Sequence, residues 1–292
     1  MAGLFTVLGA TGAQGGAVVT ALLESGARVR GVTRRTDSPS ARRLVDAGVE
    51  VVAADLSDEA SVAAAFADVD GAYALTTPFE DGPEAEVAQG STIIAAALAA
   101  RVPHLVFSSV ADADRNTGVP HFDSKFVVEQ RLASSGLSYT IVGPTYFYDN
   151  ALGGVDDIRA GVFELPLPAD APLQQLSRRD LGRFVAAVLA DPASFRGARI
   201  DIASDDPTPQ RMAEVLTAAL GSPVRLVVRD PTEVGSADMR AMYGFLAHGG
   251  YTVDVAELHA RYPHVGWQSF QEWVSTELAP LLTPPGAARP AP

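Results

Sequence analysis

Hydrophobic residues in the first half of the chain form short continuous runs that alternate with longer segments of helical periodicity. The runs predict strands near residues 4–8, 28–33, 49–53, 71–75, 104–108 and 139–142. Helices are expected between them, near 13–25, 40–46, 58–66, 84–101 and 123–135. Strands that are nearly continuous in apolar residues and separated by helices are typical of a parallel sheet covered on both faces. The pattern therefore predicts an α/β fold with a doubly wound, Rossmann-type parallel sheet.

This alternation weakens after about residue 150. Helices are expected near 179–190 and 208–220, and short strands near 199–203 and 224–228. We interpret residues 1–150 as a nucleotide-binding domain and 151–279 as a smaller C-terminal α/β substrate lobe with later returns to the main sheet. Residues 280–292 contain five prolines and are predicted to be a disordered tail.

Three glycines follow the first expected strand at intervals of three residues. Gly9, Gly12 and Gly15 lie between a strand and a helix. Glycine permits a sharp turn and a close approach to a pyrophosphate, and the helix N-terminus supplies N–H donors. The segment therefore predicts a dinucleotide-binding loop, with contacts from Gly9, Thr11, Gly12, Ala13, Gln14 and Gly15. A glycine-rich turn without a ligand is the alternative.

Arginines follow the second expected strand, where a site that prefers NAD carries a carboxylate for the ribose. Arg34 and Arg35 come first, and the first acidic residue after them is Asp37. Guanidinium groups bind phosphate oxygens bidentately, so the pattern favours NADP(H) over NAD(H). Asp55 and Leu56, after the third strand, are expected beside the adenine; for Asp55 a turn or helix cap is the alternative.

Composition narrows the classes of partner. The 292 residues carry a net charge of −13, which argues against binding to nucleic acid or to an anionic membrane. The absence of cysteine excludes a thiol nucleophile, and the histidine spacing predicts no metal site. We therefore expect a cytoplasmic monomer or homodimer that acts on a small molecule. The richness of the sequence in Ala, Arg and Gly suggests a bacterial source.

Four segments resemble the NmrA-like family of atypical short-chain dehydrogenase/reductases. They are residues 9–15 (GATGAQG), 32–35 (VTRR), 121–125 (HFDSK) with Glu129, and 139–144 (YTIVGP) with Asn150. The resemblance spans roughly residues 1–275 and implies a Rossmann-type domain, NADP(H) preference and a smaller C-terminal lobe. Some members of that family reduce quinones, dyes or phenylpropanoid-type substrates with NADPH. Others are redox sensors that bind the dinucleotide and regulate a partner protein.

The resemblance also implies a place for the catalytic residues. Reductases of the wider superfamily use Tyr-x-x-x-Lys, in which lysine binds the ribose and tyrosine donates the proton. Lys125 matches the lysine, but His121 stands where the tyrosine would be. His121 can act as a general acid from the same helix face as Lys125, although a histidine at a helix start is the alternative. Tyr146 or Tyr148 is a replacement donor, with core packing as the alternative.

The carboxyl ends of other strands are expected to complete the cofactor site. After the fourth strand, Thr76, Thr77 and Pro78 are expected to flank the nicotinamide side. At the end of the fifth strand, Ser108 or Ser109 is expected to line the cofactor. Pro144, after the sixth strand, is a further expected contact.

The leading hypothesis is an NADPH-dependent reductase of a small apolar or aromatic carbonyl, enone or quinone. The alternatives are an NADP(H)-sensing regulator without turnover that binds a protein partner, and an epimerase-like or dehydratase-like enzyme with a retained cofactor.

Overall fold

The structure is a computed structural model that describes residues 3–77 and 82–282. Contacts divide the chain into two compact units. The first comprises the described residues up to Pro144 together with Arg178–Ile202, and the second comprises Thr145–Ser177 and the described residues from Ala203 onward. The chain therefore leaves the first unit after Pro144, six residues before the boundary expected at residue 150. It re-enters the first unit at Arg178.

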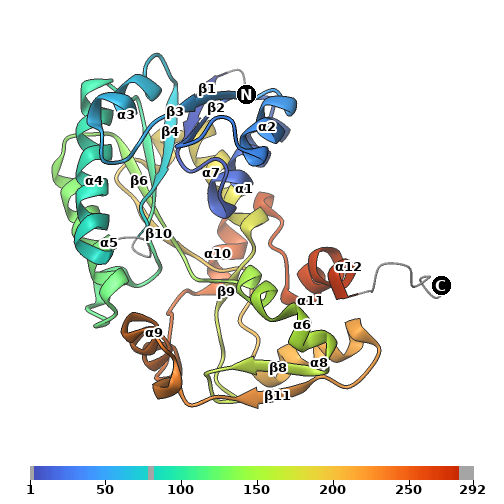
Figure 1. The fold of residues 1–292 in the computed structure, drawn as a ribbon. Helices are drawn as coiled ribbons and strands as arrows, with labels where there is room; N and C mark the ends of the chain where they lie inside the picture. Colours follow the sequence, from blue (N-terminus) through green and yellow to red (C-terminus); the bar gives the residue numbers. More distant parts are fainter. Residues whose placement is uncertain (1–2, 78–81, 283–292) are drawn as a thin grey trace. The chain divides into compact units, whose positions relative to one another are not determined.

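A seven-stranded sheet forms the centre of the first unit (Figure 1). Its order is β10 (Arg199–Ile202), β6 (Tyr139–Pro144), β5 (Leu105–Ser108), β4 (Gly71–Leu75), β1 (Leu4–Val7), β2 (Arg28–Thr33) and β3 (Glu50–Ala53). Every neighbouring pair is parallel. The chain winds outward from β1 in one direction through β2 and β3, and in the other through β4, β5 and β6. The predicted doubly wound sheet is confirmed.

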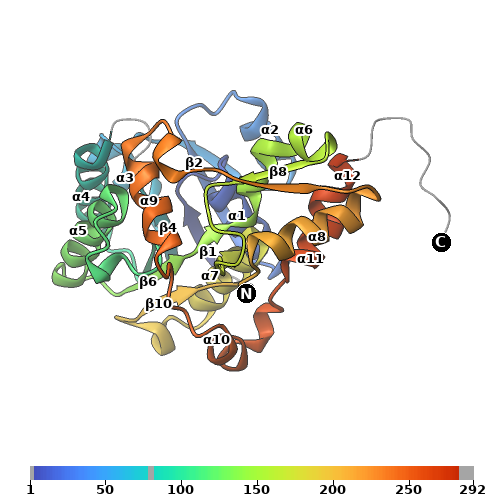
Figure 2. The ribbon, with the colours of Figure 1, turned by 90° about the horizontal axis from the view of Figure 1, so that it is seen from below.

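Helices cover both faces of this sheet. In Figures 1 and 2, α4 (Gly82–Ala99) and α5 (Pro120–Ser134) lie side by side, away from α1 (Ala13–Glu24) and α7 (Arg178–Ala190). The α4 side also carries α3 (Glu59–Ala65), while α2 (Pro39–Asp46) follows β2. Helix α7 buries Leu181, Phe184, Val185 and Val188, and this spacing forms one apolar stripe. Asp58 caps α3 as a helix-start signal should, accepting from the N–H groups of Ala60 and Ser61.

Two small parallel sheets and several helices build the second unit. β7 (Tyr146–Phe147) pairs with β9 (Gln175–Leu176), and β8 (Val162–Leu165) pairs with β11 (Arg225–Val228). The α-helices are α6 (Val155–Arg159), α8 (Pro209–Leu220), α9 (Ala237–Ala247), α10 (Val255–Arg261), α11 (Phe270–Trp273) and α12 (Ala279–Leu282). Residues 280–282 are therefore helical, which corrects the start of the predicted disordered tail; residues 283–292 lie outside the described residues.

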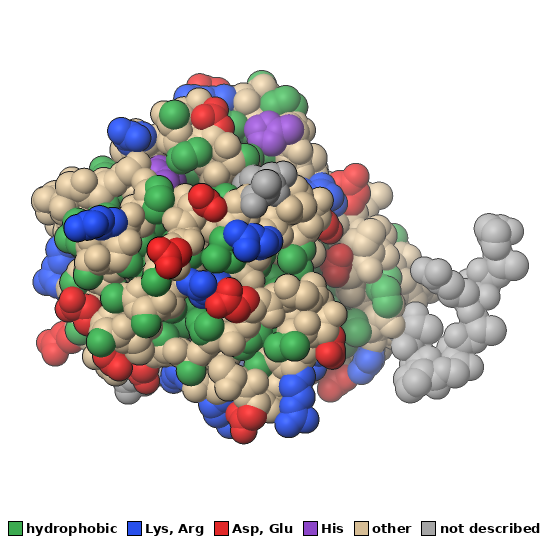
Figure 3. Space-filling model, turned by 90° about the horizontal axis from the view of Figure 1, so that it is seen from above, with side chains coloured by type: hydrophobic (Ala, Val, Ile, Leu, Met, Phe, Trp, Pro, Cys, Tyr) green, Lys and Arg blue, Asp and Glu red, His purple; other side chains and the backbone are tan. Residues whose placement is uncertain are grey.

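Short helical turns complete the elements. They are 3-10 turns at Ala113–Arg115, Tyr148–Gly154, Pro192–Phe195, Pro231–Glu233 and Pro263–Val265, and a π-helical turn at Val274–Leu278. None of the helices in the described residues has both the length and the apolar composition needed to cross a bilayer. On the face drawn in Figure 3, acidic and basic side chains are intermixed.

Candidate functional site

The loop between β1 and α1 has the geometry of a phosphate-binding turn. Gly9 has a φ of +64°, a backbone conformation that glycine adopts without steric cost. A Cβ at Gly15 would collide with the carbonyl group of Gly9, so glycine is what lets α1 begin this close to the end of β1. Gly12 caps α1 without a side-chain hydrogen bond, and the first turn contains no acidic residue. The N–H groups of Ala13 and its neighbours at the helix start therefore suit an anion.

Gln14 joins this loop to the middle of β4 and to the carboxyl end of β5. Its Oε1 accepts hydrogen bonds from the hydroxyl of Tyr73 in β4, at 3.2 Å, and from Ser108 Oγ at the end of β5, at 2.9 Å. Burial raises the pKa of Tyr73, so its phenol remains a hydrogen-bond donor at neutral pH. Ligands of open α/β sheets bind at this edge.

Two exposed arginines follow β2 beside the glycine loop. Thr33 Oγ1, at the end of β2, lies 3.4 Å from Thr11 Oγ1 and accepts from the Arg35 N–H at 3.4 Å. Arg34 is the next residue after Thr33, and its charge acts on Asp55. The structure thus brings Thr11, Arg34 and Arg35 to one edge of the sheet.

Asp55 takes part in a local turn. Its Oδ1 accepts from the Ser57 N–H at 2.8 Å and from Ser57 Oγ at 2.7 Å. These hydrogen bonds, with the charge of Arg34, hold the pKa of this exposed carboxyl below its usual value. Leu56 is half-buried and packs against the core. The turn that was the alternative for Asp55 is present, and contact of either residue with adenine remains a prediction.

Lys125 lies in a buried ion pair. It is the only lysine in the chain, and the other 21 residues of the lysine and arginine total are arginines. Its Nζ is 2.7 Å from Glu86 Oε1, and 3.4 Å from both the carbonyl oxygen and Oγ1 of Thr76, which follows β4. Helix α5 thus presents its ammonium group to the carboxyl end of β4, at the same sheet edge as Gln14.

Glu86 is fully buried and receives three donors. Besides Lys125, Thr76 Oγ1 donates to its Oε1 at 2.7 Å, and Ser124 Oγ donates to its Oε2. A buried charge is tolerated when it is paired and its remaining acceptor positions are filled. Glu86 was missed by sequence reasoning. The available signal was its place on the buried stripe of α4, where Gly90, Ile93 and Ala97 follow it at helical spacing.

His121 is the second residue of α5, one turn before Lys125. Its ring is buried and meets the ring of Phe122 edge-on, with centroids 4.7 Å apart. It therefore occupies the helix-start position that was the alternative to catalysis, and its role as an acid remains a prediction.

The other expected contacts lie near the same strand ends. The Thr77 N–H donates to Gln89 Oε1 at 3.1 Å, Ser109 is buried directly after β5, and Pro144 ends β6, where its carbonyl oxygen accepts from the Ala111 N–H at 2.9 Å. Pro78 lies outside the described residues. Within residues 3–77 and 82–282, no group of three His, Asp or Glu side chains is arranged to hold a metal ion.

Glu129 forms an ion pair that joins α5 to the sheet. Arg199 Nε in β10 donates to Glu129 Oε2 at 2.8 Å, while its Nη1 binds Asp201 at 2.6 Å. Burial raises the pKa of Glu129, and the guanidinium of Arg199 opposes that shift. The pair attaches α5 to the edge strand of the sheet.

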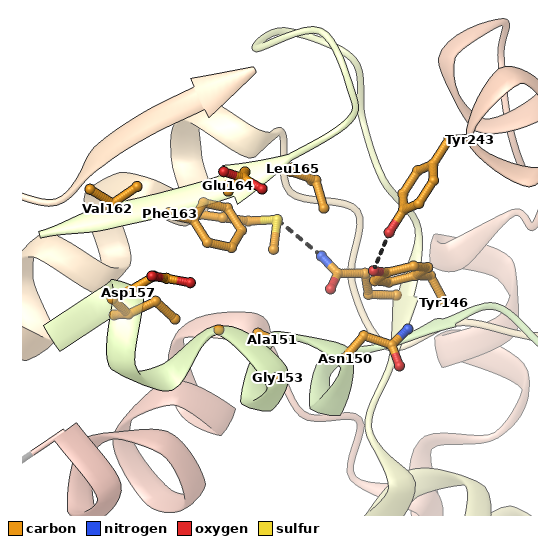
Figure 4. Close-up of a pocket in the computed structure, with 14 residues that line it drawn as sticks. Tyr146, Asn150, Ala151, Gly153, Asp157, Val162, Phe163, Glu164, Leu165 and Tyr243 are labelled. Atoms are coloured by element: carbon orange, nitrogen blue, oxygen red, sulfur yellow. Dashed lines mark hydrogen bonds between the residues drawn. The ribbon is translucent and has the colours of Figure 1, made fainter. Parts of the chain in front are cut away.

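The two candidate tyrosines belong to the second unit. Tyr148 is fully buried; its hydroxyl donates to the carbonyl oxygen of Gln268 at 2.9 Å, and its ring packs against Phe270 and Trp273. This is the core-packing alternative. Tyr146 instead lines a cavity of about 250 Å³, where its hydroxyl lies 3.1 Å from that of Tyr243 (Figure 4).

A model of the NmrA-like family matches residues 1–254. The chain belongs to the NmrA-like family. The resemblance stated from the sequence is confirmed, and the first unit of this NmrA-like protein has the NAD(P)-binding Rossmann-type fold.

Two curated relatives cover most of this NmrA-like chain. The NmrA-like family domain-containing oxidoreductase notA of Aspergillus sp. (strain MF297-2) is 33% identical over 275 residues, which is 84% of this chain and 79% of that protein. The NAD(P)H azoreductase of Xenophilus azovorans is 29% identical over 225 residues, 77% of this chain and 76% of that protein.

Solved structures share the fold of the NmrA-like chain. The NADPH-dependent quinone oxidoreductase QOR2 of Escherichia coli, complexed with NADPH, aligns with a TM-score of 0.79 at 24% identity, over 93% of this chain and 98% of that one. NmrA, a negative transcriptional regulator in complex with NAD, aligns with a TM-score of 0.79 at 20% identity, over 96% of both chains.

The first unit of this NmrA-like protein thus gathers three kinds of group at one sheet edge. They are an uncapped helix N-terminus, exposed guanidinium groups, and a buried ammonium group held by a carboxylate. The first two suit phosphates and the third suits ribose hydroxyls. The sequence analysis missed Tyr73, Glu86 and Tyr243, whose roles become clear from hydrogen bonds to partners distant in the chain.

Proposed function

We propose that this NmrA-like protein is an NADPH-dependent oxidoreductase that reduces a small apolar or aromatic carbonyl, enone or quinone. The proposal rests on one observation: the glycine loop, with its helix N-terminus free of a side-chain cap, and the buried Lys125 lie at one edge of the sheet. The relatives named oxidoreductase and azoreductase, and the fold shared with a quinone oxidoreductase, support it.

The residues of the first unit fit a bound dinucleotide. The 9–15 turn and the N-terminus of α1 would hold the pyrophosphate, and Arg34 with Arg35 the 2′-phosphate. Asp55 and Leu56 would flank the adenine, and Thr76, Thr77 and Ser108 the nicotinamide side. Bound NADPH supplies the hydride.

Lys125 orients the ribose in this proposal. Its ammonium group donates hydrogen bonds to ribose hydroxyls, and Glu86 positions that group without contacting the cofactor. The proton for the reduced product comes from His121, from Tyr146 or from water.

The test is NADPH oxidation, followed by absorbance, with a panel of quinones, enones, aromatic aldehydes and azo dyes, and with NADH in parallel. We expect turnover with NADPH to exceed that with NADH, and Lys125→Met to abolish most of it. Absence of turnover with the whole panel, while NADPH binds tightly, would contradict the enzymatic proposal.

The cofactor preference is tested by a matched pair of variants. Arg34→Ala/Arg35→Ala is expected to weaken NADPH binding by tenfold or more, because each lost charge-assisted hydrogen bond contributes about 1.5–3 kcal/mol. NADH binding should be unchanged. The control, Arg42→Ala/Arg43→Ala, removes the same charge from the exposed face of α2. Equal losses for both cofactors, or in both variants, would overturn the 2′-phosphate assignment.

A second candidate function is a dinucleotide-sensing regulator. His121 stands in place of the proton-donating tyrosine, and the fold is shared with a transcriptional regulator that binds NAD. A sensor needs a partner that binds the nucleotide-loaded and empty states with different affinity. Pull-down experiments with and without NADPH test this, and the absence of any nucleotide-dependent partner would count against it.

A further inference from the structure

The second unit contains a cavity of about 250 Å³ within its own fold. Its walls come from β7, β8, β9, α6, α8, α9 and the turn at Tyr148–Gly154. An engineered apolar cavity of about 150 Å³ binds benzene. This space therefore has room for a substituted aromatic ring.

One end of the cavity carries two hydroxyl groups. Tyr146 and Tyr243 approach with their oxygens 3.1 Å apart, at the right of Figure 4. Burial raises the pKa of both phenols, so both keep their protons at neutral pH. Two neutral phenols have two hydrogens, and only one can lie between the two oxygens. The Asn150 side chain also hydrogen-bonds to Tyr146 and opposes the rise that burial causes in the pKa of that phenol, as a donor does, so the second phenol hydrogen remains for a ligand that accepts a hydrogen bond.

The middle of the cavity is apolar. Phe163, Leu165, Met212 and Ile158 contribute its hydrophobic surface. Gln175 is the buried polar group here, and its Nε2 donates to Met212 Sδ at 3.2 Å.

The opposite end carries negative charge. Asp157 and Glu164 are exposed; in Figure 4 Asp157 lies on the side opposite the two phenols, and Glu164 lies between Asp157 and the phenols, next to Phe163 and Leu165. Arg229, at the end of β11, pairs with Glu164 at 2.6 Å and also acts on Asp157. No Lys, Arg or His is among the described residues that line the cavity. An anionic ligand would meet net negative charge here, whereas an uncharged or cationic ligand would not.

We infer that this cavity binds an uncharged or cationic molecule with one aromatic ring and a carbonyl or quinone oxygen, which accepts its hydrogen bond from the Tyr146–Tyr243 pair. That this ligand is the substrate rests on the proposed reductase function. Binding itself requires neither NADPH nor turnover, so the two ideas can fail separately.

The ligand side of the test compares molecules of nearly one shape, by NMR titration of the whole protein without cofactor. The reference is 4′-methylacetophenone. In 4-isopropyltoluene the carbonyl is replaced by a group that accepts no hydrogen bond, 4-acetylbenzoate adds a negative charge, and 4′-(aminomethyl)acetophenone adds a positive one. We expect the ketone to bind about fivefold more tightly than the hydrocarbon. The anion should bind at least about tenfold more weakly than the ketone or the cation.

On the protein side, one variant removes the two phenol hydroxyls and another removes the two carboxylate charges. Tyr146→Phe/Tyr243→Phe should abolish the preference for the ketone over the hydrocarbon; both tyrosines are changed because either phenol alone would have a free hydrogen. Asp157→Asn/Glu164→Gln should raise the affinity for the anion until it is close to the affinity for the ketone. These carboxylates are exposed, so this variant is expected to fold even if the tyrosine variant does not. The control is Asp170→Asn/Glu257→Gln, which removes the same charge elsewhere on the second unit.

Three results would overturn the inference. They are no binding of 4′-methylacetophenone at millimolar concentration, equal binding of anion and ketone to the unmodified protein, and a ketone preference that survives loss of both phenols. Ketone binding without NADPH turnover would uphold the cavity and reject the reductase function. Turnover without binding at this cavity would uphold the reductase function and reject the cavity as a ligand site.

Discussion

Lys125 and Glu86 are buried charges that lie on neighbouring helices, 39 positions apart in the chain. Each has the other as its counter-ion, and water is largely excluded from both. Loss of one partner from such a pair is costly because the remaining charge stays buried without compensation.

The energetic coupling of this pair can be measured. We expect Glu86→Gln and Lys125→Met each to lower the free energy of unfolding by roughly 3–5 kcal/mol. Glu86→Gln/Lys125→Met should lose clearly less than the sum, because no lone charge remains. Urea unfolding of the four proteins gives the coupling. Losses that simply add would show that the two charges are solvated independently.

His104 is a buried neutral imidazole in the first unit. Its Nε2 lies 2.9 Å from Thr140 Oγ1, which itself donates to the carbonyl oxygen of Phe195. Thr140 therefore accepts from Nε2–H, and Nδ1 accepts from Ser138 Oγ, also at 2.9 Å. Burial, with the charge of Arg196, lowers the pKa of His104 to about 4.

This lowered pKa predicts a loss of stability in acid. The unfolded chain takes up the proton near pH 6.5, whereas the folded protein does so near pH 4. The contribution of His104 to stability is thus complete above pH 6.5 and is lost as the pH falls toward 4, by up to about 3 kcal/mol. Unfolding free energies at pH 7 and 4.5 should differ less in His104→Gln than in the unmodified protein. The exposed His264→Gln is the control, and an unchanged pH dependence in His104→Gln would contradict this assignment.

At the scale of elements, the junction of β1 and α1 depends on one close approach. A Cβ at Gly15 would meet the backbone of Gly9, which cannot move without displacing the loop, whereas a Cβ at Gly16 would lie 3.5 Å from the Ala10 carbonyl oxygen, an ordinary contact. Gly15→Ala should therefore cost roughly 1–3 kcal/mol and weaken NADPH binding. Gly16→Ala should be neutral or stabilising by up to about 1 kcal/mol. Unfolding and nucleotide fluorescence test the pair, and equal behaviour of the two variants would contradict the steric argument.

Elements with a strong local pattern were predictable from the sequence. The predicted bounds of β2 and β4 match those observed: β4 is an apolar run, and β2 ends before the polar residues that follow Thr33. The short elements of the second unit were harder: β8, α9 and α10 were not predicted. The four residues of β8 and the seven of α10 have too few positions to establish a period, and tertiary contacts decide their form; the eleven residues of α9 were missed although they are long enough to show one.

At the scale of the whole molecule, the unit boundaries could not be read from the order of elements alone. Helix α7 and β10 come after the first part of the second unit, yet they complete the first unit's sheet and one of its helical layers. Candidate site residues on local motifs, such as the glycine loop and Lys125, were accessible to sequence reasoning. Their partners were not: Glu86 precedes Lys125 by 39 positions, and Tyr243 follows Tyr146 by 97.

The burial of the one lysine has a chemical consequence for the proposed enone and quinone substrates. Such electrophiles alkylate thiols and unprotonated amines. This chain has no cysteine, and its single side-chain amine is buried as an ammonium ion against Glu86. The proposed substrates would therefore find no thiol and no exposed lysine amine to modify, which leaves histidine imidazoles, slower nucleophiles than thiolates, as the side chains open to alkylation.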